Sequence, residues 1–172
     1  MINNFSRKFV SSTMTSEEGM SELKRIDAII SCKLSKIVIF GSLSAAFFTL
    51  MFGGTILDFI SSFLVSIFVI LCSRTLSKYN VTFFISNFCG AAIASLLSIL
   101  FIKIGLGDNM DKIIIGSIMP LVPGVSITNA IRDTMSGDFV SGLSRGMEAI
   151  VIASAIAFGA GFVLNIYLKG MI

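Results

Sequence analysis

The chain has 172 residues, of which 55% are hydrophobic and only 13% are charged, with a formal net charge of +3. A soluble domain carries roughly 25% charged residues. The mean hydropathy of +0.94 and the long apolar blocks therefore exclude a soluble or peripheral protein. The sequence contains no histidine, so no imidazole base, proton relay or metal ligand is available, and any proton chemistry must use carboxylates.

The first 35 residues differ from the rest, and we treat residues 1–35 and 36–172 as separate parts. Thr15 and Glu18 fit a capping box, which marks the start of a helix. Apolar residues then recur at helical spacing: Met20, Leu23, Ile26, Ile30 and Leu34. We interpret this segment as a cytoplasmic amphipathic helix that packs at the inner mouth of a bundle, with a regulatory or lipid-sensing role as the alternative.

Five apolar blocks follow, each close to the roughly 20 residues that a helix needs to cross the hydrocarbon. They run from Ile37 to Gly53, Ile56 to Cys72, Val81 to Ile104, Ile113 to Ile131 and Leu143 to Leu168. The tight Phe52–Thr55 connection predicts a hairpin of the first two. The predicted fold is an all-α polytopic membrane bundle of about five transmembrane helices.

The basic residues predict the orientation of these spans. Of the 13 Lys and Arg, Lys103, Lys112 and Lys169 fall on one side of the membrane and the other ten on the opposite side. Basic residues collect on the cytoplasmic side, so we expect a multi-pass protein of a bacterial plasma membrane with a cytoplasmic N-terminus and an external C-terminus. The cysteines have no Cys-x-x-Cys spacing, and neither a disulfide framework nor a zinc site is supported.

The fourth span is predicted to be broken between Pro120 and Gly124. Pro120 and Pro123 each remove a backbone donor and clash with the preceding turn, while Gly124 adds conformational freedom. The second half-helix would begin with free amides near Val125 to Ile127, where the helix dipole places a positive partial charge. Discontinuous helices of this kind bind anionic groups in secondary transporters, so a carboxylate would fit there.

The half-helix after the break carries polar residues on two neighbouring strips. Ser126, Asn129 and Asp133 are spaced i, i+3 and i+7, and Thr128 and Arg132 lie on the adjacent strip. Ionisable groups inside a membrane usually mark a functional site. The alternative is a proline-kinked helix whose polar residues only satisfy one another between helices.

The fifth span begins with a polar face made of Ser141, Ser144, Arg145 and Glu148. Arg145 and Glu148 stand at i, i+3 and can pair locally, either as an interfacial anchor or as a gate or proton site. Small residues follow at four-residue spacing, and we interpret them as a packing face: Gly142 and Gly146, then Ala149, Ala153, Ala157 and Gly161.

The residues from Pro120 to Asp133, with Ser136-Gly-Asp, Ser141-Gly-Leu-Ser-Arg and Glu148-Ala after them, closely resemble the threonine/serine exporter family, including its split form of two small membrane subunits. The resemblance extends to Leu50-Met-Phe-Gly-Gly and to Asn4-Phe-Ser-Arg, and so covers most of the chain. Family members usually carry a further hydrophilic segment before the position of Asn4, where this chain begins. The resemblance implies a secondary exporter of small amino acids or, in split members, of dicarboxylates such as succinate, driven by an ion gradient.

The spans also predict a missing partner. Transporters commonly place the substrate between two structural repeats, yet five spans do not divide into equal halves and no second Pro-x-x-Pro-Gly occurs. In the family the complement is a fused C-terminal membrane domain or a separate small subunit. We therefore expect a second small membrane subunit besides the lipid bilayer and a small carboxylate-bearing metabolite, with no cofactor and no nucleic acid.

These observations favour a membrane subunit of an exporter rather than an enzyme. The substrate would be bound by Pro120, Pro123, Gly124, Ser126, Thr128, Asn129 and Arg132, and coupling or gating would use Asp133, Asp138, Arg145 and Glu148. Two alternatives remain. One is a structural or assembly subunit without a substrate site, and the other is a membrane-embedded enzyme acting on lipid phosphates, which would lack an activated nucleophile.

Overall fold

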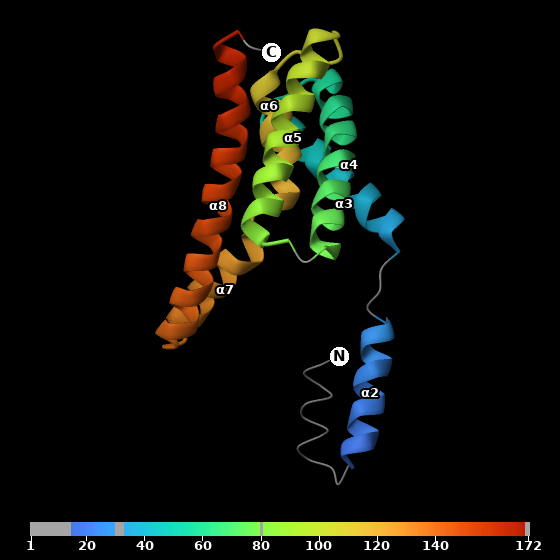
Figure 1. The fold of residues 1–172 in the computed structure, drawn as a ribbon, viewed down its shortest axis with the longest axis vertical. Helices are drawn as coiled ribbons and strands as arrows, with labels where there is room; N and C mark the ends of the chain where they lie inside the picture. The colour runs from blue at the N-terminus through green and yellow to red at the C-terminus, as the bar shows by residue number, and fades with distance from the viewer. Residues whose placement is uncertain (1–14, 30–32, 80, 171–172) are drawn as a thin grey trace. The chain divides into compact units, whose positions relative to one another are not determined.

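The computed structural model describes residues 15–29, 33–79 and 81–170, and every regular element in this part of the chain is a helix (Figure 1). Two compact units, residues 1–37 and 38–172, are considered separately. The Asn4-Phe-Ser-Arg stretch, Ile30 and Cys32 lie outside the described residues. The family resemblance and the candidate site are carried almost entirely by the second unit.

The first unit contains helix α2 (Ser16–Ile29), and the predicted capping box at its start is confirmed. The Thr15 amide donates to Glu18 Oε2 at 3.1 Å, and the Glu18 amide donates to Thr15 Oγ1 at 3.4 Å. Arg25 pairs with Glu22 at 3.3 Å on the helix surface. The apolar side chains of Met20 and Leu23 are exposed.

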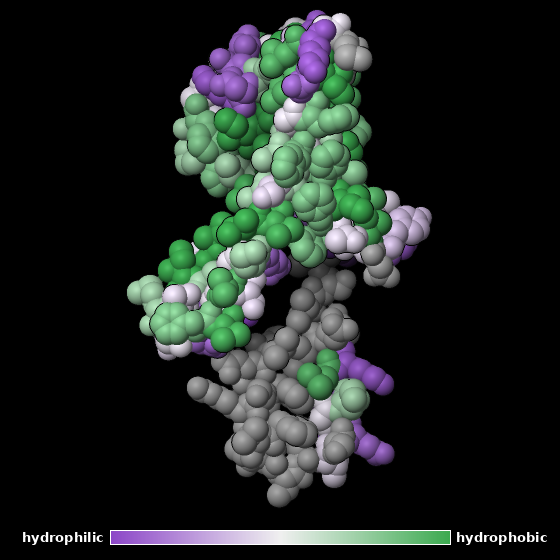
Figure 2. All heavy atoms as spheres, turned by 60° about the vertical axis from the view of Figure 1, so that its left-hand side comes forward, coloured by the Kyte–Doolittle hydropathy of each residue, from purple (hydrophilic) through white to green (hydrophobic). Residues whose placement is uncertain are grey.

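The membrane bundle consists of α3 (Leu34–Met51), α4 (Ile56–Lys78), α5 (Phe83–Lys103), α6 (Met110–Ile118), η1 (Met119–Leu121), α7 (Gly124–Met135) and α8 (Phe139–Leu168). Four of these helices are long and apolar enough to span a membrane, and a fifth span exists if the bent pair Met110–Leu121 and Gly124–Met135 is counted as one. The chain is thus a multi-pass membrane protein with the predicted all-α fold. Hydrophobic residues cover the sides of the bundle, and hydrophilic residues collect at the end with the α5–α6 connection (Figure 2).

The predicted break in the fourth span is confirmed. Helix α6 passes into the short 3-10 helix η1 at Met119, Val122 and Pro123 leave helical geometry, and α7 begins at Gly124. The two halves are bent by 59°. The prolines explain the position of the break, because neither can donate the amide hydrogen bond that a continuous helix requires.

The core of the bundle lies between α4, α5 and α6. Its fully or almost fully buried members are Val65, Val69, Ala94, Ile113 and Leu121. Helix α8 is long enough to use two partners: its first half packs against α7, and its second half runs beside α5, where Phe88 and Phe162 are in contact (Figure 1). The break therefore lets one long helix support both α7 and the core bundle.

The predicted small-residue packing face of α8 is confirmed within this chain in its first half and is wrong in its second half. Ala149 is buried, but Ala153, Ala157 and Gly161 are exposed. After Ala149, the residues buried on α8 are instead Ala155, Gly159 and Val163. Gly159 determines this rotation, because a Cβ there would lie 3.0 Å from the carbonyl carbon of Phe88 and would collide with its oxygen.

Candidate functional site

The break before α7 leaves backbone amides at the start of this helix without hydrogen-bond partners. The Gly124 amide donates to Val122 O at 2.8 Å and the Ile127 amide to Pro123 O at 3.0 Å. Among the described residues, no partner is recorded for the amides of Val125 and Ser126. Gly124 has open space on the side where a Cβ would stand. Two unpaired amides at the positive end of a helix form a favourable place for an anion.

The two polar strips on α7 differ in their surroundings. Ser126, Asn129 and Asp133 are all half-buried, whereas Thr128 and Arg132 are exposed. Thr128 Oγ1 donates back to Gly124 O at 3.0 Å, so this hydroxyl is already satisfied by its own helix. The first strip lies on the covered side of α7, and the second is left open by this chain.

Asp133 is the centre of a small charged group. Arg145 Nε on α8 lies 3.0 Å from Asp133 Oδ2, and Arg132 Nε lies 3.9 Å from Asp133 Oδ1. The side chains of Arg132 and Arg145 are 73% and 48% exposed, so both guanidinium groups keep donors free for another anion. The structure thus brings together three of the predicted site residues from two different helices.

The local pair expected between Arg145 and Glu148 is not formed. Arg145 turns to Asp133, and Glu148 is exposed with no ion pair recorded for it in the described part of the chain. Antiparallel packing of α7 on α8 explains this choice, because it places Asp133 opposite Arg145. The carboxylate of Asp133 is also less exposed than that of Glu148. Glu148 and Asp138 are separate from the charged group.

Asp138 is an N-terminal cap of α8. The Ser141 amide donates to Asp138 Oδ1 at 3.1 Å, and the Ser141 hydroxyl donates to Oδ2 at 2.7 Å. These two hydrogen bonds lower the pKa of Asp138. The capping geometry accounts for this carboxylate without a further role.

Close packing fixes the hairpin of α7 and α8. A Cβ on Gly142 would collide with Thr134 Oγ1 and would lie 3.0 Å from Ala130 O, and Gly146 also faces Ala130. The backbone of α8 therefore approaches α7 directly, which holds Asp133 and Arg145 at a fixed separation. Gly142 and Gly146 are packing residues, as their spacing in the sequence predicts.

A second polar group, which was not predicted from the sequence, is centred on Asp58 near the start of α4. This side chain is fully buried and accepts hydrogen bonds from the α3–α4 and α5–α6 connections. A signal was present, because Thr55-x-x-Asp58 ahead of an apolar run is a capping-box pattern. The pattern does not show that a second connection, about fifty residues away, supplies further donors.

The family model described as "Putative threonine/serine exporter" matches residues 1–167. No curated protein and no solved structure matches the chain.

Proposed function

The chain belongs to the threonine/serine exporter family, and from this premise we propose that it is one membrane half of an ion-driven exporter for small carboxylate-bearing metabolites. The substrate would be a small amino acid such as threonine or serine, or a dicarboxylate. The observation that carries the proposal is the broken span, whose second half starts with free amides and carries Arg132 and Asp133, with Arg145 of α8 against Asp133, about two turns further along the same helix.

Binding of a carboxylate is supported by the charges around α7. The Val125 and Ser126 amides offer donors at the positive end of the helix dipole. Arg132 is exposed and its contact with Asp133 is long. The planar pair of N–H donors on its guanidinium group, which carboxylates prefer, therefore remains available. We assign the carboxylate of the substrate to this region, with Ser126 and Asn129 as hydrogen-bond partners.

A second membrane subunit is supported by the surface of α7 and the start of α8. No residue of α7 is fully buried. Large apolar side chains on this hairpin are strongly exposed: Val125, Ile131, Met135, Phe139, Val140 and Leu143. Polar and charged groups beside them are costly to expose to lipid. A partner half that covers the hairpin would enclose the site.

The test is transport in proteoliposomes that hold the chain alone or together with a complementary family subunit. The vesicles are loaded with radiolabelled threonine or succinate, and efflux is followed with an imposed ion gradient. We expect little efflux from the chain alone and clear efflux from the pair, because the site would lie between two halves. Full efflux from the single chain would contradict the half-transporter proposal.

Charge variants connect the efflux to the proposed site. Arg132→Gln should reduce efflux by roughly tenfold or more, as expected for loss of one charge-assisted hydrogen bond to the substrate. Arg25→Gln removes an equally exposed arginine that pairs with Glu22 on α2, and serves as the matched control. If both variants transport like the wild type, or if the pair transports nothing, a structural or assembly role becomes the better explanation.

A further inference from the structure

We propose that Ser42, Ser66 and Ser117 form a sodium site in the middle of the bundle, beside the C-terminal end of α6. The inference rests on the proposed export function, because it names the ion whose gradient would drive export. The site is separate from the expected coupling groups near α7 and α8, which are all ionisable side chains.

The three serines are buried without hydrogen-bond partners. Their side chains have no exposed surface, and none of the three Oγ atoms has a partner in the described part of the chain. Other fully buried serines differ, because Ser95 and Ser98 donate to carbonyl groups of their own helix. A buried hydroxyl without a partner is costly and rare in folded proteins. A partner from outside the chain is therefore expected for these three.

Contacts between α3 and α6 place Ser42 and Ser117 at the same depth. Gly116 packs directly on α3, since a Cβ there would lie 2.9 Å from Ala45 O. Successive spans run in opposite directions, so α6 is antiparallel to α3. The residue after Gly116 therefore stands at a level between Ala45 and Ser42, and this residue is Ser117.

Contacts between α3 and α4 bring Ser66 to the same level. Gly41 packs on α4, since a Cβ there would lie 2.7 Å from Ile70 Cδ1. Ser66 precedes Ile70 by four residues on the same face of α4, and Ser42 follows Gly41 on α3. Helix α4 also packs against α6. Three neighbouring helices thus each bring one serine to within about one helical turn, or about 5 Å, along the bundle axis.

This level lies in the middle of the spans. Ser42 is central in α3 and Ser66 is close to the centre of α4, while Ser117 belongs to the last turn of α6, just before the break. Carbonyl groups at the C-terminal end of a helix carry a negative partial charge, which favours a cation. In secondary transporters, such ends of broken helices coordinate sodium near the midplane of the bilayer.

The chemistry of the site favours a monovalent cation. Hydroxyl and carbonyl oxygens are ligands for hard cations, and a serine hydroxyl does not titrate at biological pH, so the site does not bind a proton. Divalent cations prefer carboxylates, and no group of three or more acidic, cysteine or histidine side chains in the described residues could hold a metal ion. The one fully buried carboxylate there, Asp58, is already engaged by amide groups of Thr55, Asp108 and Asn109.

The space at this level favours sodium over the larger potassium ion. A Cβ on Gly116 would collide with Thr49 Oγ1, so α3 and α6 approach each other closely beside the serines. The fully buried side chains show a closed form, in which the site is open to neither side of the membrane. Its central depth would allow access from either end when the helices separate.

The experiment measures sodium binding by the purified full chain in detergent micelles. The melting temperature is recorded in sodium chloride and in potassium chloride at equal ionic strength, and binding of radioactive sodium gives the dissociation constant. A ligand that binds only the folded state stabilises it. We therefore expect the melting temperature to rise with sodium until the site is saturated, and to change little with potassium.

Alanine variants connect the binding to the three hydroxyls. Ser42→Ala, Ser66→Ala and Ser117→Ala should each raise the dissociation constant for sodium roughly tenfold or more, as expected for loss of one contact to a charged group. Ser98→Ala is the matched control, because this equally buried hydroxyl donates to Ala94 O at 2.7 Å, and its affinity should equal that of the wild type. Each variant is tested separately, so two remain if one fails to fold.

Stability in sodium-free buffer gives a second measurement. The three site variants remove hydroxyls without partners, so their melting temperatures should equal or exceed that of the wild type. Ser98→Ala loses a hydrogen bond and should melt at a lower temperature. Lower melting temperatures for all four variants would show that the three hydroxyls have partners within the chain, which would overturn the inference.

Three binding results would also overturn it: no sodium-specific rise in the wild type, wild-type affinity in the three site variants, or an equal loss of affinity in Ser98→Ala. In the first case the hydroxyls hold only water. Binding is measured on the chain alone, so the export proposal is tested separately. Sodium binding without efflux by the reconstituted pair would keep the site and contradict export, whereas full efflux in sodium-free buffers would keep export and refute sodium as the coupling ion.

Discussion

Replacement of Gly142 by alanine tests whether direct backbone contact between α7 and α8 holds the charged group. The added Cβ would collide with Thr134 Oγ1 and would stand 3.0 Å from both Ala130 O and the Thr134 amide nitrogen. Two of these three atoms are backbone, so a side-chain rotation cannot relieve the contact. Overpacking of this kind costs about 1–3 kcal/mol, which exceeds the gain of up to about 1 kcal/mol in helix propensity.

Gly161→Ala is the matched control, because it makes the same change in the same helix where no atom lies within 4 Å of the new Cβ. The free energy of unfolding should therefore be lower for Gly142→Ala than for Gly161→Ala by about 1–3 kcal/mol. The assay is denaturant-induced unfolding of the full chain in detergent micelles. Adding Thr134→Ala should recover only part of the loss, since the backbone contacts remain.

The effect should extend to function, because displacement of α8 from α7 would separate Arg145 from Asp133. Efflux by the reconstituted pair should fall in Gly142→Ala and stay unchanged in Gly161→Ala. Equal stability of the two variants would refute the packing argument. Unequal stability with equal efflux would show that the hairpin geometry does not matter for transport.

Three other predictions concern the Asp133–Arg145 pair, the cap at Asp138 and the orientation of the chain. The partly exposed Asp133–Arg145 pair should contribute only about 0.2–1 kcal/mol to stability in a double-mutant cycle of Asp133→Asn and Arg145→Gln, whereas each single variant should clearly reduce efflux. A larger coupling energy would assign the pair to stability instead. Because its folded pKa is depressed, Asp138 stabilises the fold above its unfolded pKa, and this stabilisation is lost as the pH falls through the lower folded value. The melting temperature should therefore fall less steeply between about pH 5 and about pH 3 for Asp138→Asn than for the wild type. An unchanged slope would contradict the role of the Ser141 hydrogen bonds. A reporter fused after Ile172 should be external, and a cytoplasmic signal would exclude the predicted orientation.

Several local features could be read from the sequence because they depend on neighbouring residues. Thr15 and Glu18 are three positions apart, so the capping box follows from helix geometry alone. Pro123 lacks an amide hydrogen wherever it stands, which fixes the break before Gly124. The spans follow from apolar blocks of the required length.

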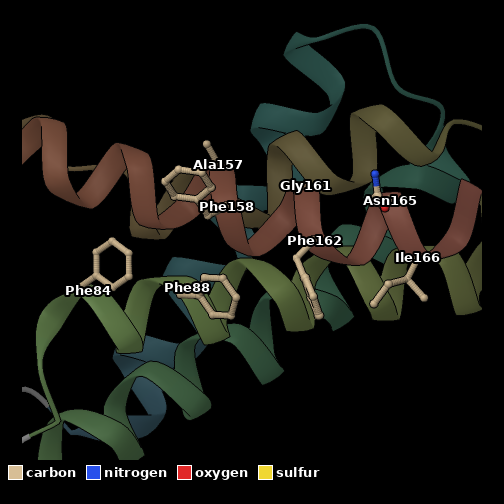
Figure 3. Close-up of a pocket in the computed structure, with 8 residues that line it drawn as sticks. All are labelled: Phe84, Phe88, Ala157, Phe158, Gly161, Phe162, Asn165 and Ile166. Atoms are coloured by element: carbon tan, nitrogen blue, oxygen red, sulfur yellow. The ribbon is translucent and has the colours of Figure 1, made fainter.

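The partners of charged and small residues could not be read in this way. Arg145 has Glu148 within reach on its own helix, yet it pairs with Asp133 because α7 folds back along α8. The exposed face of α8 carries Ala157 and Gly161, where they line an apolar groove of about 530 Å³ beside Phe88 and Phe162 (Figure 3). Small residues permit close approach, but the rotation of a helix depends on which neighbour comes closest.

By itself the sequence determined that this protein is an all-helical membrane protein with a broken span, and it identified the family through the residues around that break. These properties depend on the hydrophobic effect, on proline geometry and on short-range capping, all of which act within a few residues. Only the tertiary structure decided that Asp133 meets Arg145 and that Asp58 is enclosed by the α5–α6 connection. Those contacts join residues far apart in the chain, and they depend on how whole helices pack rather than on the preferences of any one segment.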